Sequence, residues 1–199
     1  MNQRLKETIE KASNLPIKES RLPVLHQLVD FVQKKVENGQ PIHLNFICTH
    51  NSRRSQLSQI WAKTAAWLNG IEISAHSGGV EVTAFNERAV ESCRRMGFDI
   101  TQSTEGTNPK YNIKLDENTA LTCFSKVYDD PVNPNTGFAA VMTCSDADEN
   151  CPFIPGTEAR IPLRYEDPKA FDNTELESEK YDERNLQIAS ELLYVFRKV

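Results

Sequence analysis

The stretch IHLNFICTHNSRRS, residues 42–55, contains the feature that decides the fold of this chain. It opens with an apolar run typical of a buried strand, and a helical pattern follows it. Between them lies a Cys-x5-Arg loop that starts at Cys48 and ends at Arg54. A loop between a strand and a helix points backbone N–H groups inward, and the helix N-terminus adds partial positive charge. Such a loop stabilises a tetrahedral anion and the thiolate that attacks it.

Each loop side chain therefore has an expected task. We expect Cys48 to be a nucleophile, Arg54 to pair as a planar fork with two anion oxygens, and Ser55 to hydrogen-bond the sulfur. The alternative is a buried, inert cysteine beside an exposed arginine. Two consecutive arginines at a helix start oppose the helix dipole, which indicates a negative group nearby. The expected oxyanion-binding residues are Thr49, His50, Asn51, Ser52, Arg53, Arg54 and Ser55.

Length and composition limit the possible classes of protein. The chain has 199 residues, of which 39% are hydrophobic and 26% charged, as in an ordinary globular protein. Its net charge of −5 disfavours nucleic acid as a partner. No apolar run is long enough to span a membrane, and the start lacks the apolar core of a signal peptide. We therefore expect a cytoplasmic protein. Its five cysteines are then expected to be catalytic, redox-active or metal-binding.

Apolar periodicity predicts alternating strands and helices. Helices are expected at 22–36, 57–68, 83–96 and 182–197, strands at 42–47, 72–76, 120–127 and 138–143, and mainly irregular structure at 101–120 and 152–178. The two later strands read as continuous apolar runs of the buried parallel type. This alternation predicts an α/β fold with a parallel sheet covered by helices, and residues 1–40 are expected to pack on it as a helical extension.

A second pair of cysteines lies where the sheet should bind ligands. Ligands of parallel sheets bind at the carboxyl ends of strands, where both Cys48 and Cys144 are expected. Cys144 and Cys151 lie on a polar, acidic segment without apolar periodicity. Three thiols at one edge make a thiol–disulfide relay possible. A metal site with His50 or His76 is the alternative, but the spacing matches no zinc module.

Two Asp-Pro pairs compete for the role of general acid. A thiolate that attacks an oxyanion expels an oxygen, and a nearby carboxyl group can protonate it. Turn chemistry already explains Asp130, which precedes an Asn-Pro-Asn turn. Asp167 lies in a longer loop, and Pro168 restricts it to an extended backbone.

These motifs together resemble the low-molecular-weight protein tyrosine phosphatase family. The resemblance rests on ICTxNSxRSQ at 47–56 and SAxSG at 74–78. The later motifs VMTCSDADENCP at 141–152 and YEDP at 165–168 are similar to one branch, the thioredoxin-coupled arsenate reductases. The resemblance implies a three-layer fold with a four-stranded parallel sheet, and a catalytic domain at 41–199 with an insertion near 102–137.

The resemblance also implies roles for the site residues. Cys48 would be the nucleophile, Arg54 the anion clamp and Asp167 the acid, and Cys144 and Cys151 would be the second and third redox cysteines. The chain departs from the family at three positions: His50 replaces a glycine, Arg53 a second loop cysteine, and Gln59 a glutamate tied to a cation site. A non-glycine residue in a left-handed conformation costs about 1–2 kcal/mol. No bound metal or cofactor is expected.

Three functional hypotheses follow. The first is an arsenate reductase with a three-cysteine relay that a thioredoxin-like dithiol reduces. The second is a low-molecular-weight protein tyrosine phosphatase that hydrolyses phosphate monoesters through a cysteinyl-phosphate, which leaves Cys144 and Cys151 idle. The third is a non-catalytic thiol or metal-binding sensor, which leaves the Arg54 loop unexplained. The expected partners are arsenate or a phosphate ester and the external dithiol, with no nucleic acid and no membrane.

Overall fold

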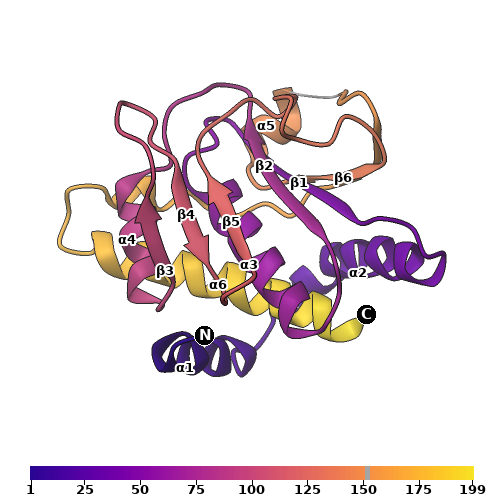
Figure 1. The fold of residues 1–199 in the computed structure, drawn as a ribbon, viewed down its shortest axis with the longest axis horizontal. Coiled ribbons are helices and arrows are strands. Elements are labelled where there is room, and N and C mark those ends of the chain that lie inside the picture. Colours follow the sequence, from indigo (N-terminus) through magenta and orange to yellow (C-terminus); the bar gives the residue numbers. More distant parts are fainter. Residues whose placement is uncertain (151–152) are drawn as a thin grey trace.

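A computed structural model describes residues 1–150 and 153–199 (Figure 1). In chain order its elements are α1 (Gln3–Ser13), η1 (Glu19–Arg21), α2 (Leu22–Glu37), β1 (His43–Cys48), α3 (Arg54–Leu68), β2 (Ser74–Gly79), α4 (Glu87–Arg95), β3 (Asp99–Gln102), β4 (Tyr111–Lys114), β5 (Ala120–Cys123), β6 (Phe138–Met142), α5 (Ser145–Asn150), β7 (Thr157–Ile161), η2 (Pro168–Phe171) and α6 (Glu177–Lys198).

The expected four-stranded parallel sheet flanked by helices is confirmed. Its strands lie in the order β2-β1-β6-β7, and every neighbouring pair is parallel. Ile47 pairs with Gly78 on one side and with Met142 on the other. The Ile47 carbonyl also accepts hydrogen bonds from the backbone N–H and the hydroxyl of Thr143, at 2.7 and 2.9 Å. The next residue of each chain segment, Cys48 and Cys144, therefore lies at the same edge of the sheet.

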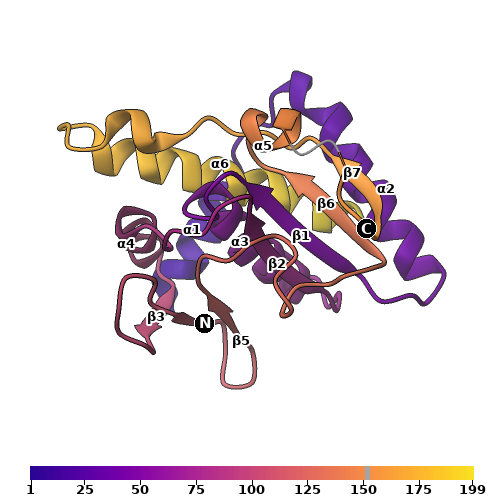
Figure 2. The ribbon, with the colours of Figure 1, turned by 90° about the horizontal axis from the view of Figure 1, so that it is seen from above.

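β1 lies in the interior of the sheet and is almost completely buried. Five of its six residues are buried, because other strands cover both of its edges and side chains cover both of its faces. One face, with Leu44 and Phe46, belongs to a large apolar core that α3 and α6 share. Trp61 of α3 donates its indole N–H to the Asn185 side chain of α6 at 2.6 Å, which satisfies both polar groups inside this core. Figure 2 shows the long α6 running behind the sheet.

The other face of the sheet has a smaller cover. Ile47, Phe138 and Met142 form a separate cluster there with Ala147 of α5 and Ile154. Figure 2 shows α5 above this face, at the end where β1 and β6 finish. The two cysteines at the strand ends, Cys48 and Cys144, belong to this cluster.

The fourth strand of the sheet is not the one that the sequence predicted. Residues 120–127 do not form a strand of the parallel sheet, although Val127 makes an isolated parallel bridge to Gly79 at the end of β2. The fourth strand is β7, within the segment 152–178 that was expected to be mostly loop. β7 lies at an edge, and only Ile161 of its five residues is buried. An edge strand can be polar, so TEARI lacks the continuous apolar run that a central parallel strand shows.

The expected insertion holds a second sheet. β3, β4 and β5 form an antiparallel sheet that was not predicted: residues 101–120 are mostly irregular, as expected, but they include β4 and one end each of β3 and β5. The strand within 120–127 is antiparallel and ends at Cys123. The strands have four residues each and alternate between buried and exposed positions only along β4. Such short segments carry too little periodicity to be recognised. Figure 1 shows this sheet beside the parallel one.

Several predicted boundaries were also wrong. The helix expected from residue 83 begins at Glu87, because the Asn86 side chain accepts a hydrogen bond from Arg88 N at 3.0 Å and caps it there. The strand expected at 72–76 is shifted to Ser74–Gly79, and the closing helix begins five residues early, at Glu177. Val36 and Leu68, the last residues of two expected helices, are exposed.

The N-terminal helices pack on α6. Leu5, Ala12, Leu25 and Leu28 are buried in the same core as the sheet. Arg21, just before α2, pairs with the buried Glu191 of α6 through two hydrogen bonds of 2.9 and 2.7 Å. Within the described residues, none of the helices combines the length and the apolar character needed to span a bilayer.

The Arg21–Glu191 pair gives a testable consequence for stability. Replacement of Arg21 by Met should lower the free energy of unfolding by about 3 kcal/mol, because it leaves a buried carboxylate without its partner. Urea denaturation followed by circular dichroism measures this value. The matched control is Arg4→Met on the exposed side of α1, and equal stability of the two variants would contradict the prediction.

Candidate active site

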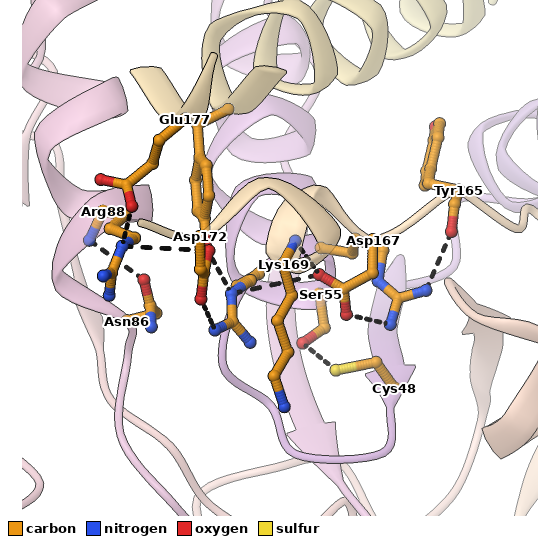
Figure 3. A network of polar contacts seen from close by, with 12 residues as sticks. Cys48, Ser55, Asn86, Arg88, Tyr165, Asp167, Lys169, Asp172 and Glu177 are labelled. Atoms are coloured by element: carbon orange, nitrogen blue, oxygen red, sulfur yellow. Dashed lines mark hydrogen bonds and ion pairs between the residues drawn. The ribbon is translucent and has the colours of Figure 1, made fainter. Parts of the chain in front are cut away.

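The cysteine loop connects β1 to α3 and is centred on the sulfur of Cys48. The backbone N–H of Asn51 donates to Cys48 Sγ at 3.1 Å, and Ser55 Oγ lies 3.1 Å from the same sulfur. The Ser55 hydroxyl already accepts a hydrogen bond from the Asn51 side-chain NH₂ at 2.9 Å. Its hydrogen is therefore free to point at Cys48. Figure 3 shows the contact between these two side chains. Two donors thus converge on a sulfur at the N-terminus of a helix.

Asn51, and not His50, takes the left-handed conformation of this loop. Its φ is +47°, and His50 is not among the residues with positive φ. The expected strain at His50 is therefore wrong, because the chain places its turn one residue later, at an asparagine, which tolerates this region. The Asn51 carboxamide oxygen accepts from the backbone N–H of Lys126 at 3.0 Å and from Gln56 at 3.1 Å.

Residues outside the loop donate hydrogen bonds to its carbonyl groups. The His50 carbonyl accepts from the hydroxyl groups of Ser125 and Thr83, at 2.9 and 3.1 Å. The Ser52 carbonyl accepts from the backbone N–H of Asn86 at 2.9 Å. These contacts fix the loop backbone in the conformation in which the Asn51 N–H points at Cys48 Sγ, as an anion site requires.

Arg54 lies at the start of α3 and reaches the segment before η2. Its two terminal nitrogens donate to the Tyr165 carbonyl at 2.9 Å and to the Asp167 carboxylate at 2.7 Å. Its Nε is buried and has no hydrogen-bond partner among the residues that the structure describes. A buried guanidinium N–H without an acceptor is costly, so this arginine retains capacity to bind an anion.

Asp167 is the aspartate that the structure brings to the loop. Its carboxylate binds Arg54 through one oxygen and accepts the backbone N–H of Lys169 through the other, at 3.0 Å. Asp167 thereby caps η2 and is directed towards the sulfur end of the loop (Figure 3). Asp130, the competing candidate, accepts the backbone N–H of Val132 at 3.0 Å and serves as a turn residue.

Arg53 does not face solvent at the helix start. Its side chain is 11% exposed and binds the Tyr181 hydroxyl of α6 at 2.7 Å and the Asp172 carboxylate at 3.3 Å. The negative group that the paired arginines indicated is therefore two carboxylates, Asp167 and Asp172. Nothing in the sequence identified Asp172 or Tyr181, because both lie more than 100 residues from the loop.

The structure brings Cys144 next to the loop. Its sulfur lies 3.5 Å from the Thr49 hydroxyl and is 1% exposed as a residue. Thr49 donates its hydrogen to the Asp146 carboxylate at 2.6 Å, so its oxygen is left to accept from the Cys144 thiol. The backbone N–H of Ala147 also reaches Cys144 Sγ, at 3.4 Å. Cys151 lies outside the described residues.

The two other cysteines are not part of the site. Cys93 and Cys123 are fully buried in the large core. Burial raises the pKa of the Cys93 thiol strongly and that of Cys123 to about 12. Both remain neutral thiols at physiological pH and are therefore poor nucleophiles.

The residues named in the metal alternative are dispersed among other contacts. His50 Nε2 lies 3.5 Å from Glu81, and burial and the nearby Lys126 lower the pKa of His76 to about 4. Gln59 accepts a hydrogen bond from Ser77 at 2.6 Å. No group of three histidine, cysteine or acidic side chains in the described part of the chain is arranged to hold a metal ion.

An open cleft of about 760 Å³ adjoins the loop. His50, Ser52 and Arg53 form its inner side, and Lys169 and Tyr111 lie on its walls. The connection between β3 and β4 contributes the outer wall, so the insertion shapes the approach to the loop. Ligand pockets typically have volumes of this size.

Comparisons with known proteins agree with this architecture. No protein-family model matches the chain. It is 32% identical over 123 residues to arsenate reductase 2 of Staphylococcus haemolyticus, which covers 62% of this chain and 76% of that protein. It is 29% identical over 123 residues to an arsenate reductase of Staphylococcus aureus strain Newman, with the same coverage.

Two solved structures share the fold. A YwlE mutant from Bacillus subtilis aligns with a TM-score of 0.53 and 13% identity over 78% of this chain and 97% of that one. A low-molecular-weight phosphotyrosine phosphatase from Vibrio cholerae aligns with a TM-score of 0.52 and 12% identity, over 77% and 93%. The two structures show the fold, and the sequence identity shows that this chain belongs to the arsenate reductase family.

Proposed function

We propose that this protein is an arsenate reductase with a three-cysteine relay that a thioredoxin-like dithiol reduces. The observation that carries the proposal is the position of Cys144, whose sulfur lies 3.5 Å from the hydroxyl of Thr49 in the cysteine loop. A hydrolase needs only Cys48, whereas a relay needs a second thiol at the same edge of the sheet. The names of the relatives, arsenate reductases of two Staphylococcus species, support the same reaction.

The first step forms a bond between sulfur and arsenic. Arsenate binds to the inward backbone N–H groups of the loop and to Arg54, whose buried Nε gains an acceptor. The Cys48 thiolate, held by Asn51 N–H and Ser55, attacks arsenic. One oxygen leaves as water after Asp167 gives it a proton, so the product is a Cys48–arsenate thioester-like adduct.

The second step reduces the arsenic. The Cys144 thiolate attacks the sulfur of Cys48, a disulfide bond forms, and the bond between sulfur and arsenic breaks. Its electron pair stays on arsenic, which goes from As(V) to As(III) and leaves as arsenite. Cys151 then attacks Cys144, which releases the Cys48 thiolate and leaves a Cys144–Cys151 disulfide. An external dithiol reduces that disulfide and completes the cycle.

The second candidate is hydrolysis of a phosphate monoester. Cys48, Arg54 and Asp167 suffice for a cysteinyl-phosphate that water cleaves, and the cleft of about 760 Å³ leaves room for an organic substituent. This function gives no task to Cys144. The third hypothesis, a thiol sensor, gives none to the Arg54–Asp167 pair, which lies within 2.7 Å.

The proposed cycle needs no bound cofactor, because the external dithiol supplies both electrons. A reduced dithiol of the thioredoxin kind is available in the cytoplasm, where we place the protein. The decisive experiment supplies purified protein with arsenate, thioredoxin, thioredoxin reductase and NADPH and follows NADPH oxidation, beside an aryl phosphate assay without reductant. Arsenate-dependent oxidation supports the reductase, and release of phosphate alone supports the hydrolase.

The nucleophile is tested first. Cys48→Ser should abolish arsenate turnover and any hydrolysis of an aryl phosphate, because a hydroxyl is far less ionised than a thiol in this loop. Cys93→Ser is the matched control, since that thiol lies in the core and takes no part in the cycle. Turnover that survives in Cys48→Ser would remove this residue from the mechanism.

The anion clamp is tested with a substitution that keeps the charge. Arg54→Lys should lower kcat by about 100-fold, because an ammonium group lacks the fork that stabilises charge on several oxygens. Steady-state kinetics at saturating arsenate measure the loss. Near-normal kcat in this variant would mean that Arg54 only holds Asp167 and Tyr165.

The relay cysteines distinguish the two enzymes. Cys144→Ser should stop at the Cys48 adduct, and Cys151→Ser should accumulate a Cys48–Cys144 disulfide, which peptide mass spectrometry detects after thiol blocking. Hydrolysis of an aryl phosphate should stay nearly unchanged in both variants. If both turn over arsenate with thioredoxin at the wild-type rate, the hydrolase is the correct assignment.

A further inference from the structure

Arg53 connects the cysteine loop to two other parts of the fold. Its Nε donates to the Tyr181 hydroxyl of α6 at 2.7 Å, and its Nη2 donates to Asp172 Oδ2 at 3.3 Å. The same Tyr181 hydroxyl donates its hydrogen to Asp172 Oδ1 at 2.7 Å. Three side chains from three separate segments thus form a closed triangle of hydrogen bonds.

The triangle is stiff because it is largely removed from water. Tyr181 is fully buried, and the side chains of Arg53 and Asp172 are 11% and 18% exposed. The carboxylate uses both oxygens, and the hydroxyl both accepts and donates. A charge-assisted bond in such an environment is stronger than a neutral one, and loss of any member leaves another without its partner.

The position of Asp172 connects this triangle to the proposed acid. The short helix η2 begins after Asp167, which caps it, and Asp172 follows directly after its last residue, Phe171. Arg54 binds the first of these aspartates, and Arg53 binds the second, so consecutive arginines hold opposite ends of η2. Arg53 Nε also lies 4.0 Å from Asp167 Oδ1. Figure 3 shows Asp172 and Asp167 on either side of Lys169 in this segment.

We propose that Arg53 is a positioning residue that fixes η2 over the cysteine loop and thereby aims the Asp167 carboxyl group at the leaving oxygen. When an oxyanion binds, it competes with Asp167 for Arg54, and the start of η2 loses its ion pair. The triangle at the other end then keeps the segment in place. The proposal rests on the proposed function only in that Asp167 acts as the acid.

A double-mutant cycle tests this coupling. Arg53→Met should lower kcat for arsenate at least tenfold, because a displaced acid loses part of the 10²–10⁴-fold that proton transfer contributes. In an Asp167→Asn background the same substitution should change kcat less than twofold. The inhibition constant of inorganic phosphate should stay within twofold in Arg53→Met, since the anion binds to the loop and Arg54. Equal losses in both backgrounds would overturn the proposal.

A matched control separates positioning from a general loss of packing. Arg95→Met removes another arginine that ties the chain to α6, through Asp182 at 2.8 Å, and Asp182 is not a member of the triangle. Arg95→Met should have the same kcat as the wild type, although its thermal stability should be comparable to that of Arg53→Met. Arg53→Lys keeps the charge but lacks the separate nitrogens with which the guanidinium binds both Tyr181 and Asp172. It should therefore restore kcat only in part. Full activity of Arg53→Met, or equal losses in Arg95→Met, would contradict the positioning role.

Hydrogen exchange gives a readout that does not depend on activity. Backbone N–H groups of residues 169–174 should exchange at least tenfold faster in Arg53→Met and in Tyr181→Phe than in the wild type. Tyr181→Phe keeps the buried ring and serves if Arg53→Met does not fold. Unchanged exchange in a folded variant would show that the triangle does not fix η2. If the wild type hydrolyses aryl phosphates but does not reduce arsenate, the proposed function fails, and the cycle run on that substrate still tests Arg53.

Discussion

The side chain of Asn51 holds the arrangement on which the rest of this site depends. Its backbone takes the left-handed conformation that turns the loop, and its N–H donates to Cys48 Sγ. Its carboxamide then connects the loop to two other parts of the fold: the NH₂ donates to Ser55 at the start of α3, and the oxygen accepts from Lys126 beyond the second sheet. Another residue here would still supply the backbone N–H, but without the carboxamide the left-handed turn would lose its hydrogen bonds to neighbouring elements, and Ser55 would lose the group that orients it.

The sequence predicts the centre of the molecule well and its periphery poorly, for a physical reason. β1 and β6 are buried on both faces, so their apolar runs are unambiguous, and Cys48 and Cys144 follow from their ends. β7 is an edge strand that exposes polar side chains, and the strands of the second sheet have only four residues each. Neither the edge strand nor these short strands have enough periodicity in their apolar residues to be predicted as strands.

The residues of the candidate site likewise fall into those that the sequence predicts and those that it does not. Its loop is continuous in sequence, so the chemistry of Cys48, Arg54 and Ser55 can be inferred from spacing alone. Asp172 and Tyr181 reach the loop only through tertiary contacts across more than 100 residues, and no local pattern distinguishes them from surface residues. The doubled arginine was the only trace of them, since two cations at a helix N-terminus require compensation from elsewhere in the fold.

The segment that leads from β5 back to the parallel sheet, residues 124–126, limits how the length and sequence of this protein can vary. Residues 124–126 supply a carbonyl to Gln56, a hydroxyl to the His50 carbonyl and a backbone N–H to Asn51. A shift of one residue there would turn the Ser125 hydroxyl to the opposite side of the chain and open the catalytic loop. The exposed turn between β4 and β5 makes no such contact among the described residues, so insertions and deletions can accumulate at that tip while the length of the return segment stays constant. The appended sheet is thus free to diversify at its outer end and is fixed in register at its inner end.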